Sequence, residues 1–517
     1  MTLYRMPIPR NGQKHNLPLL GYAAVIGLAA GLVTSLYRFI LTYLETFSIA
    51  AYGYISQHAA LILPAFIVLA AMGLGTGALI KKYRMASGSG IPQIKGVLTG
   101  YLKANWLSTL IAKFVGGAVA MAAGLSLGRE GPSIQIGASV AAGIGNKLVK
   151  NESDRRILMA SGASAGLSAA FNAPLSGVVF TLEELFKYFS PLVLLTSMIA
   201  AVVSDAVSRV MLGSGSIFNF SITGSIPISQ YWILLVLGAA LGVFGAVYNK
   251  VLLVSVKLFE KIKDRRFRPV LAFLLAGVLG LLFPAVICGG HVMIDTVSIQ
   301  SSLGFLCAAL LLKFLFSMVS YGSGAPGGIF FPLLVMGAVF GAIFAQLSIS
   351  FFGVDQALFA NLVILAMTGL FTAIVHAPIT GIVLLVEMTG SFSHFLPLSV
   401  VALTAYVVAT LCGGKPIYDS LLLNMIPTQG EAAFGKDAVQ RVTVETVVHF
   451  GSIADQKYVH ELPLPDSCTL ASIKRHGKEF VPDSDSHILA GDYLVCLTDS
   501  PDETRAREAL DALTKSP

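Results

Sequence analysis

The segment APLSGVVFTLE at residues 173–183 returns as APITGIVLLVE at residues 377–387, 204 residues later and without a gap. A weaker match supports a duplication, because PSIQIGA at residues 132–138 corresponds to PLLVMGA at residues 332–338. Helix packing through small residues would scatter such residues along the chain rather than align eleven positions. Duplicated halves with glycine-interrupted helices are typical of transporters that bind their substrate between the halves. The sequence therefore predicts an internal inverted repeat.

The composition predicts that the lipid bilayer surrounds most of the chain. Of the 517 residues, 55% are apolar and 12% are charged, whereas soluble domains carry about 25% charged residues. Apolar stretches that approach the ~20 residues of a spanning helix recur along the chain. They cover residues 17–44, 59–80, 107–127, 157–182, 191–212, 231–258, 269–288, 303–320, 330–353, 357–386 and 396–412. Because glycine or proline interrupts many of them, we expect an all-α polytopic membrane protein with short, tilted helices.

Basic residues between the spans indicate orientation rather than nucleic-acid binding. Arg5, Arg10 and Lys14 precede the first span, which places the N-terminus in the cytoplasm by the positive-inside rule. Other Lys/Arg clusters fall between apolar spans, where lipid headgroups account for them. The five cysteines form no CxxC pair and have no metal-ligand spacing, so the sequence predicts no disulfide framework, metal site or cofactor.

The texture of the chain changes after about residue 428. Short alternating runs follow, VTVETVVHF at residues 442–450 and HILAGDYLVCLTD at residues 487–499, and then an amphipathic ending at residues 501–514. We therefore expect a transmembrane domain over residues 1–428 and a small cytoplasmic α/β domain over residues 429–517.

The second domain resembles the C-terminal regulatory module of bacterial potassium-transport subunits, in which an AGD hairpin and an ELPLP turn recur. The resemblance covers about 70 residues and implies dimerisation or the sensing of a small ligand of unknown identity. A purely stabilising tail is the open alternative.

Three glycine-rich loops each run into a proline and then an apolar helix-like segment. They are GSGIP at 88–92, GREGP at 128–132 and GAPGGIFFP at 324–332. Proline suits a first helical turn, and glycines let backbone N–H groups approach an anion closely, so each loop can hold an anion without a full cation. The glycines concerned are Gly88, Gly90, Gly128, Gly131, Gly327 and Gly328. One such loop alone is usually a helix break at a packing contact, but three in a duplicated membrane protein favour an anion pathway.

The motifs GSGIP, GREGP, GGIFFP and GKPIYDS, in that order, resemble the four anion-pathway signatures of the CLC family of chloride channels and transporters. The resemblance spans residues from about 15 to 425. It implies that the hydroxyls of Ser89 and Tyr418 and the backbone amides of Ile329 and Phe330 bind chloride. Serine rather than proline at position 89 favours chloride over nitrate. The alternatives are a turn residue at Ser89 and an interfacial anchor at Tyr418.

Glu130 lies inside a glycine-rich loop that enters an apolar segment, with no acidic residue between it and Glu45. Intramembrane carboxylates are functional candidates. The resemblance implies a gating glutamate, whose carboxylate occupies the anion pathway when charged and leaves when protonated. An ion pair with the adjacent Arg129 is the alternative interpretation.

A pair of glutamates, Glu183 and Glu184, ends the apolar run LSGVVFTL. CLC exchangers carry a proton-transferring glutamate at the position of Glu184, assisted by the preceding glutamate, whereas channel members usually have an uncharged residue there. The resemblance therefore implies a chloride/proton antiporter, with a gated passive chloride channel as the alternative. A solvated helix end would also explain the pair, and Glu387, the counterpart of Glu183, is expected to be structural.

The sequence departs from the family pattern at Gln93 and Lys95, which stand where acidic residues follow the GSGIP loop in the family. This leaves the inner proton route and the coupling stoichiometry open. His291, His376 and His394 have no evident partners in the sequence and are expected to be structural, and Lys113 and Lys313 are expected to face the protein interior.

The resemblance further implies a homodimer in a bacterial inner membrane, with both termini cytoplasmic and one chloride and proton pathway in each subunit. No catalytic triad or phosphate-binding loop suggests an enzyme. A cation carrier would need acceptor groups facing the ion, whereas the three loops present donors.

Overall fold

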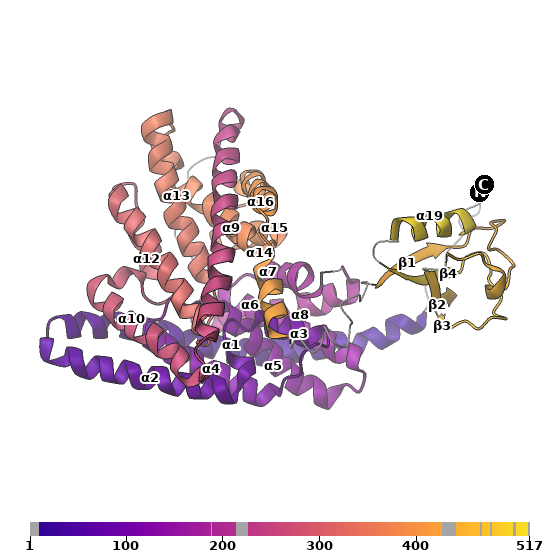
Figure 1. The fold of residues 1–517 in the computed structure, drawn as a ribbon, viewed down its shortest axis with the longest axis horizontal. Helices are drawn as coiled ribbons and strands as arrows, with labels where there is room; N and C mark the ends of the chain where they lie inside the picture. Colours follow the sequence, from indigo (N-terminus) through magenta and orange to yellow (C-terminus); the bar gives the residue numbers. More distant parts are fainter. Residues whose placement is uncertain are drawn as a thin grey trace. The chain divides into compact units, whose positions relative to one another are not determined.

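The computed structural model describes residues 10–187, 189–213, 226–426, 441–465, 468–475, 478–499 and 503–514. These residues belong to two compact units, shown in Figure 1. Lys14–Ile426 form the membrane unit, and the described residues from Arg441 onward lie in the C-terminal unit. Arg5 and the expected domain boundary at 428 lie outside the described residues.

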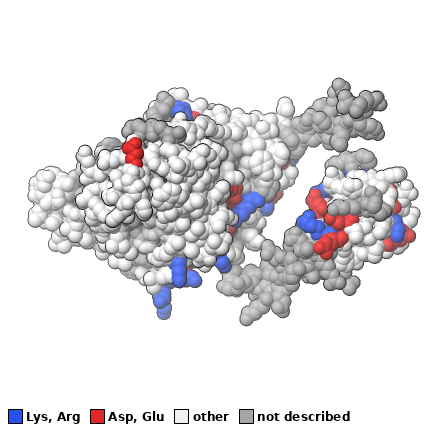
Figure 2. Space-filling view, turned by 90° about the horizontal axis from the view of Figure 1, so that it is seen from above, with Lys and Arg blue, Asp and Glu red and all other residues white. Residues whose placement is uncertain are grey.

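The membrane unit is built from helices, as the apolar pattern predicts. They are α1 Arg10–Ser56, α2 Ile62–Lys82, α3 Ile91–Leu98, α4 Trp106–Ala122, α5 Glu130–Leu148, α6 Glu152–Phe171, α7 Pro174–Phe180, α8 Pro191–Leu212, α9 Tyr231–Glu260, α10 Arg268–Leu282, α11 His291–Thr296, α12 Leu303–Gly322, α13 Phe330–Phe352, α14 Phe359–Val375, α15 Pro378–Thr389, α16 Phe395–Leu411 and α17 Ile417–Met425. Within the described residues, eight helices are long and apolar enough to cross a membrane. Figure 2 shows few charged side chains on the visible face of this unit.

Two of the predicted spans are each divided into two helices. The apolar stretch 157–182 contains the end of α6 and all of α7, and the stretch 357–386 contains α14 and most of α15. Both α6 and α14 end in a left-handed residue, Asn172 (φ 52°) and His376 (φ 64°), two residues before the proline that begins the next helix. Proline cannot continue a helix, so each stretch divides at this point. Hydropathy stays high across the division, and each pair of helices therefore reads as one apolar stretch.

Corresponding helix pairs of the two halves pack through glycine. α5 packs against α6, and α13 packs against α14. A side chain at Gly137 would place its Cβ 2.2 Å from the carbonyl oxygen of Gly162, and one at Gly337 would place it 2.7 Å from the Cα of Met367. Small residues let membrane helices approach closely, so this packing fixes the start of α5 and of α13 in each half.

The C-terminal unit is a four-stranded antiparallel sheet with one helix, as Figure 1 shows. Its elements are β1 Arg441–Val447, β2 Cys468–Arg475, β3 Lys478–Phe480, β4 Tyr493–Asp499 and α19 Glu503–Thr514, and the strand order is β1-β4-β2-β3. Val444, Ile473, Leu494 and Leu510 are buried in its core. The predicted strands over 442–450 and 487–499 thus correspond to β1 and β4, and the predicted amphipathic ending corresponds to α19.

The AGD sequence before β4 anchors this sheet through Asp492. The buried Asp492 carboxylate accepts hydrogen bonds from Arg475 Nε at 2.7 Å and Nη2 at 2.6 Å, and from the N–H of Leu489 at 2.9 Å. The carboxylate raises the pKa of Arg475 above its ordinary value. A bidentate pair of this kind fixes geometry as well as adding stability, so it ties β2 to the turn before β4.

We expect Asp492→Ala to destabilise the C-terminal unit by about 1–3 kcal/mol, because it removes the acceptor for a partly buried guanidinium and a backbone N–H. The buried thiol of Cys496 on β4 should then react with maleimide roughly tenfold faster in the full-length protein, measured by mass spectrometry. Asp485→Ala, at an exposed carboxylate, is the control. Equal labelling rates in the two variants would show that Asp492 does not anchor the sheet.

Candidate anion pathway

The three glycine loops predicted from the sequence are joined by backbone hydrogen bonds. The N–H of Gly128 donates to Gly328 at 2.6 Å, and the N–H of Gly328 donates back to Gly128 at 2.7 Å. The N–H of Gly88 donates to Gly324 at 3.2 Å, and that of Gly327 donates to Gly88 at 3.0 Å. The loop at 324–328 therefore pairs with both of the others.

Each of these loops opens directly into a helix. α3 begins at Ile91 after Gly90, which has φ 95°, and α5 and α13 begin at Glu130 and Phe330. The first N–H groups of a helix have no partner within that helix, and the helix dipole adds partial positive charge there. Three helix N-termini are thus held together by the loops that precede them, which is the arrangement that the sequence predicts.

The glycines in these loops allow a contact distance that a side chain would prevent. A Cβ at Gly90 would lie 2.4 Å from Gln135 Oε1, and one at Gly131 would lie 2.9 Å from the carbonyl oxygen of Ser89. A Cβ at Gly128 would lie 2.5 Å from Glu130 Oε2 and 3.1 Å from the Phe331 nitrogen. A larger residue at Gly90, Gly128 or Gly131 would therefore collide with these atoms.

The predicted anion-binding groups are buried. Ser89 is fully buried, and its hydroxyl accepts a hydrogen bond from the N–H of Ile91 at 3.3 Å. Tyr418, in the first turn of α17, is also fully buried, and its hydroxyl has no hydrogen-bond partner among the described residues. A buried hydroxyl without a partner costs free energy. A bound anion would satisfy the Tyr418 hydroxyl, which therefore fits the predicted role.

The carboxylate of Glu130 lies between two helix N-termini. It is fully buried and faces the backbone N–H groups of Glu130 itself and of Phe331, without hydrogen-bonding geometry. Arg129 Nε lies 3.8 Å from Glu130 Oε1, so the alternative ion pair is present as one long contact. The carboxylate occupies a position at the starts of α5 and α13 where an anion would find the same donors.

A charged cluster that the sequence did not reveal surrounds Arg129. Its Nη1 donates to Thr42 at 2.8 Å, and its Nη2 lies 3.4 Å from His291 Nε2. His291 Nδ1 lies 3.1 Å from a carboxylate oxygen of Glu45. His291 therefore has partners in the structure that the sequence did not make evident. The partners lie far away in the sequence, so local reading could not find them.

Glu184 lies in a π-helical turn, Thr181–Phe186, that continues α7. Its carboxylate is buried and accepts a hydrogen bond from Lys95 Nζ at 2.8 Å. The same Lys95 ammonium also pairs with Asp419 on α17, and Asp419 pairs in turn with Lys187. π-turns are rare and often mark functional sites. Lys95, where the sequence departs from the family pattern, is thus the counter-ion of Glu184. Asp419, beside Tyr418 in GKPIYDS, also belongs to this group of charges, which the sequence did not indicate.

Glu183 and Glu387 each cap a helix in the other half of the repeat. Glu183 accepts hydrogen bonds from the N–H groups of Ile379 and Thr380 at 3.1 and 2.7 Å, at the start of α15. Glu387 accepts them at 2.9 and 2.7 Å from the corresponding residues at the start of α7, Leu175 and Ser176. Carboxylates are favourable at helix N-termini. The structural role expected for Glu387 therefore has a physical basis, and Glu183 has the same contacts.

Lys113 and Lys313 face the interior, as expected, and each holds a loop. Lys113 Nζ donates to the carbonyl oxygens of Ala86 and Gly88 at 2.8 and 2.7 Å. Lys313 Nζ donates to those of Val286 and Cys288 at 3.0 and 2.9 Å. The two sets of contacts are related by the repeat. Of the two sets, only the contacts of Lys113 hold the segment that carries Ser89.

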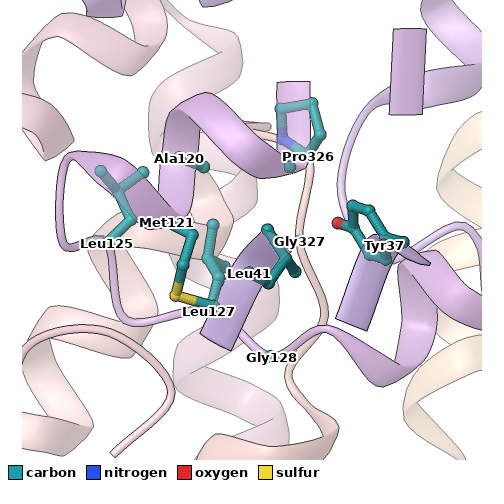
Figure 3. Close-up of a pocket in the computed structure, with 10 residues that line it drawn as sticks. Tyr37, Leu41, Ala120, Met121, Leu125, Leu127, Gly128, Pro326 and Gly327 are labelled. Atoms are coloured by element: carbon teal, nitrogen blue, oxygen red, sulfur yellow. The ribbon is translucent and has the colours of Figure 1, made fainter. Parts of the chain in front are cut away.

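A small cavity lies behind the loops, next to Tyr37 (Figure 3). Its volume is about 10 Å³, close to the space of one water molecule. It is lined by Gly128, Pro326 and Gly327, by aliphatic side chains and by Tyr37. Because the Tyr37 hydroxyl is the one polar side-chain group of this lining, we regard the cavity as a packing gap.

Comparison with known proteins agrees with this geometry. The model of the voltage gated chloride channel family matches residues 72–410. The chain belongs to this family. It is 35% identical over 421 residues to an H(+)/Cl(-) exchange transporter ClcA of Vibrio vulnificus, covering 78% of this chain and 89% of that protein. A ClcA of Klebsiella pneumoniae is 34% identical over 429 residues, covering 80% and 90%.

Solved structures confirm the mostly helical polytopic CLC fold. A slow cyanobacterial Cl-/H+ antiporter superposes with a TM-score of 0.76 at 30% identity, covering 80% of this chain and 99% of that one. A CLC-type fluoride/proton antiporter gives 0.65 at 23% identity, with 78% and 97% coverage, and supports the fold alone. The family model ends before the C-terminal unit. The likeness of that unit to potassium-transport modules stays a prediction.

We expect Lys113→Met to weaken chloride binding, because the buried carbonyl oxygen of Ala86 loses its side-chain donor and that of Gly88, next to Ser89, keeps only the N–H of Gly327, at a cost of about 1–3 kcal/mol. Lys313→Met removes the corresponding donor from the other loop and should cost similar stability while chloride affinity stays close to that of the unaltered protein. Calorimetric titration with chloride and thermal unfolding in detergent measure the two effects. Equal losses of affinity would mean that Lys113 acts only through general stability.

Proposed function

We propose that this protein exchanges chloride for protons across the membrane. The observation that carries the proposal is the Glu130 carboxylate, fully buried between the N-termini of α5 and α13. A second buried carboxylate, Glu184, lies in the π-turn after α7. Two buried carboxylates are two places at which a proton can be held inside a membrane protein. The relatives named above, which are called H(+)/Cl(-) exchange transporters, support the same function.

Chloride is bound by neutral donors in this proposal. The hydroxyls of Ser89 and Tyr418 and the backbone N–H groups of Ile329 and Phe330 hold it near the helix N-termini. The glycines of the three loops, described above, allow the backbone to come this close. Neutral donors bind an anion without the full charge of a cation, so the ion can leave again. Chloride rather than nitrate is the expected substrate because of Ser89.

Glu130 is the gate. Its carboxylate competes with chloride for the donors at the starts of α5 and α13. When the carboxylate takes up a proton, it loses its charge and no longer binds these donors, so chloride replaces it. When the proton leaves, the carboxylate returns and displaces chloride. One site thus binds either chloride or the charged glutamate, and this competition couples the two ions.

Glu184 passes protons between Glu130 and the cytoplasm, and Glu183 assists it. Glu183 holds the start of α15 through two backbone N–H groups, which keeps its neighbour Glu184 in a fixed place in the π-turn. A passive chloride channel is the second candidate function, and it would need no proton-carrying group at Glu184. The reversal potential distinguishes them, because only an exchanger's reversal potential shifts with the pH gradient.

Assembly and orientation are part of the same proposal. The chain is a multi-pass membrane protein whose relatives are bacterial. We place it in the bacterial inner membrane with both termini in the cytoplasm, as a homodimer in which each subunit has a complete pathway. All the groups assigned above come from one chain, which supports one pathway per subunit. Residues 429–517 form a cytoplasmic regulatory domain that senses a small ligand or dimerises.

Glu130→Gln should abolish coupled proton movement while chloride still passes, because the amide imitates the protonated, uncharged gate. Chloride efflux from liposomes and the pH trace of the same sample measure both ions. Glu152→Gln, at an exposed glutamate at the start of α6, is the control. Proton coupling that survives in Glu130→Gln would remove Glu130 from the gate.

Glu184→Gln should keep chloride flux and abolish proton flux, because the anion donors do not include Glu184 and the amide cannot carry a proton. The measurement is uphill proton movement driven by a chloride gradient. Proton pumping that persists would mean that Glu183 or another group carries the proton. Loss of both fluxes would assign Glu184 a structural role instead.

A further inference from the structure

We infer that Lys95 and Asp419 couple proton uptake at Glu184 to the position of Tyr418. This inference rests on the proposed exchange function and adds two positioning residues to it. The Lys95 ammonium lies between two carboxylates, Glu184 at 2.8 Å and Asp419 on its other side. We call the three side chains the carboxylate bridge. Lys95 and Glu184 are almost completely buried, whereas Asp419 is partly exposed.

The bridge joins three elements that carry the proposed transport groups. Lys95 is on α3, the helix that follows Ser89, and α3 packs against both the π-turn of Glu184 and α17. Asp419 immediately follows Tyr418 in the first turn of α17. A displacement of the Asp419 carboxylate therefore moves the same turn that holds the Tyr418 hydroxyl. Tyr418 also senses the charge of Glu184 through space, so the bridge adds a route of ion pairs between the two.

Protonation of Glu184 changes the charge balance of the bridge. With Glu184 ionised, one ammonium is shared between two carboxylates. A proton from the cytoplasm that adds to Glu184 makes it neutral, and Lys95 keeps its own proton and its positive charge. Its attraction is then directed to Asp419 alone, so the pair holds the first turn of α17 against α3 more strongly. Because coupling between sites is reciprocal, the position of Tyr418 also changes the proton affinity of Glu184.

Among the neighbouring charged groups, Lys95 is the one that forms ion pairs with both Glu184 and Asp419. Lys187, directly after the π-turn, pairs with the second carboxylate oxygen of Asp419 and is half-exposed. His376, at the end of α14, interacts with the charges of Lys187 and Asp419, and Tyr418 with that of Glu184. Lys187 touches the same carboxylate as Lys95, but among the described residues it makes no ion pair with Glu184 and acts on it only through space, more weakly than Lys95. It therefore provides a matched control.

The test measures the number of protons moved per chloride in liposomes. Asp419→Asn removes a pair interaction worth at least about twofold in an equilibrium, so this number should fall below that of the unaltered protein, while chloride still passes. Lys187→Met should leave it unchanged, and Asp419→Glu should restore it. Asp419→Asn should have no further effect in a Lys95→Met background, because the bridge is already broken there.

Two outcomes would overturn the inference: an unchanged stoichiometry in Asp419→Asn, or the same drop in the presence and absence of Lys95. If Asp419→Asn does not fold, Lys95→Met compared with Lys187→Met decides, and equal stoichiometries would overturn it. Failure of the exchange function itself is a separate result, because the unaltered protein would then move no protons against a chloride gradient.

Discussion

The backbone pairing of Gly128 with Gly328 is the constraint on which the pathway depends. These two glycines lie in corresponding loops of the two halves, and their mutual hydrogen bonds hold the starts of α5 and α13 together. If the loops separated, neither helix would present its N–H groups to the same point. The Glu130 carboxylate would then lose the backbone N–H groups that it faces. Packing of α5 on α6 and of α13 on α14 fixes the rest of these helices, so the loops are held from both sides.

The two halves share their structural contacts but differ at the residues proposed to carry protons. The lysines that hold the loops, the left-handed helix ends and the glutamate caps all occur in both halves. Glu184, by contrast, corresponds to Met388, and its π-turn corresponds to a regular part of α15. Framework contacts need the same donor and acceptor on each side. In the proposed function, proton transfer uses a carboxylate in one half only, and at that position the two halves differ.

The sequence was sufficient where the signal is local or repeated. The apolar spans, the duplication and the three loops with Glu130 could all be predicted, because each depends on residues a few positions apart or on a direct match. Pro174 and Pro378 mark where two of the apolar stretches divide into two helices. Hydropathy alone does not contain this signal. The contacts of Lys95 with Glu184 and Asp419 and those of His291 with Glu45 could not be predicted. Such pairs depend on how distant helices pack, and no local pattern records that.

The exchanged caps of Glu183 and Glu387 bear on the origin of the chain. Each half ends its repeated helix with a carboxylate that only the other half can satisfy, and each begins that helix with N–H groups that need the other half's carboxylate. A protein made of one half would leave both requirements unmet. Two copies of it related by a two-fold axis would meet both requirements reciprocally. The contact inside this one chain thus has the reciprocity of an interface between two identical subunits.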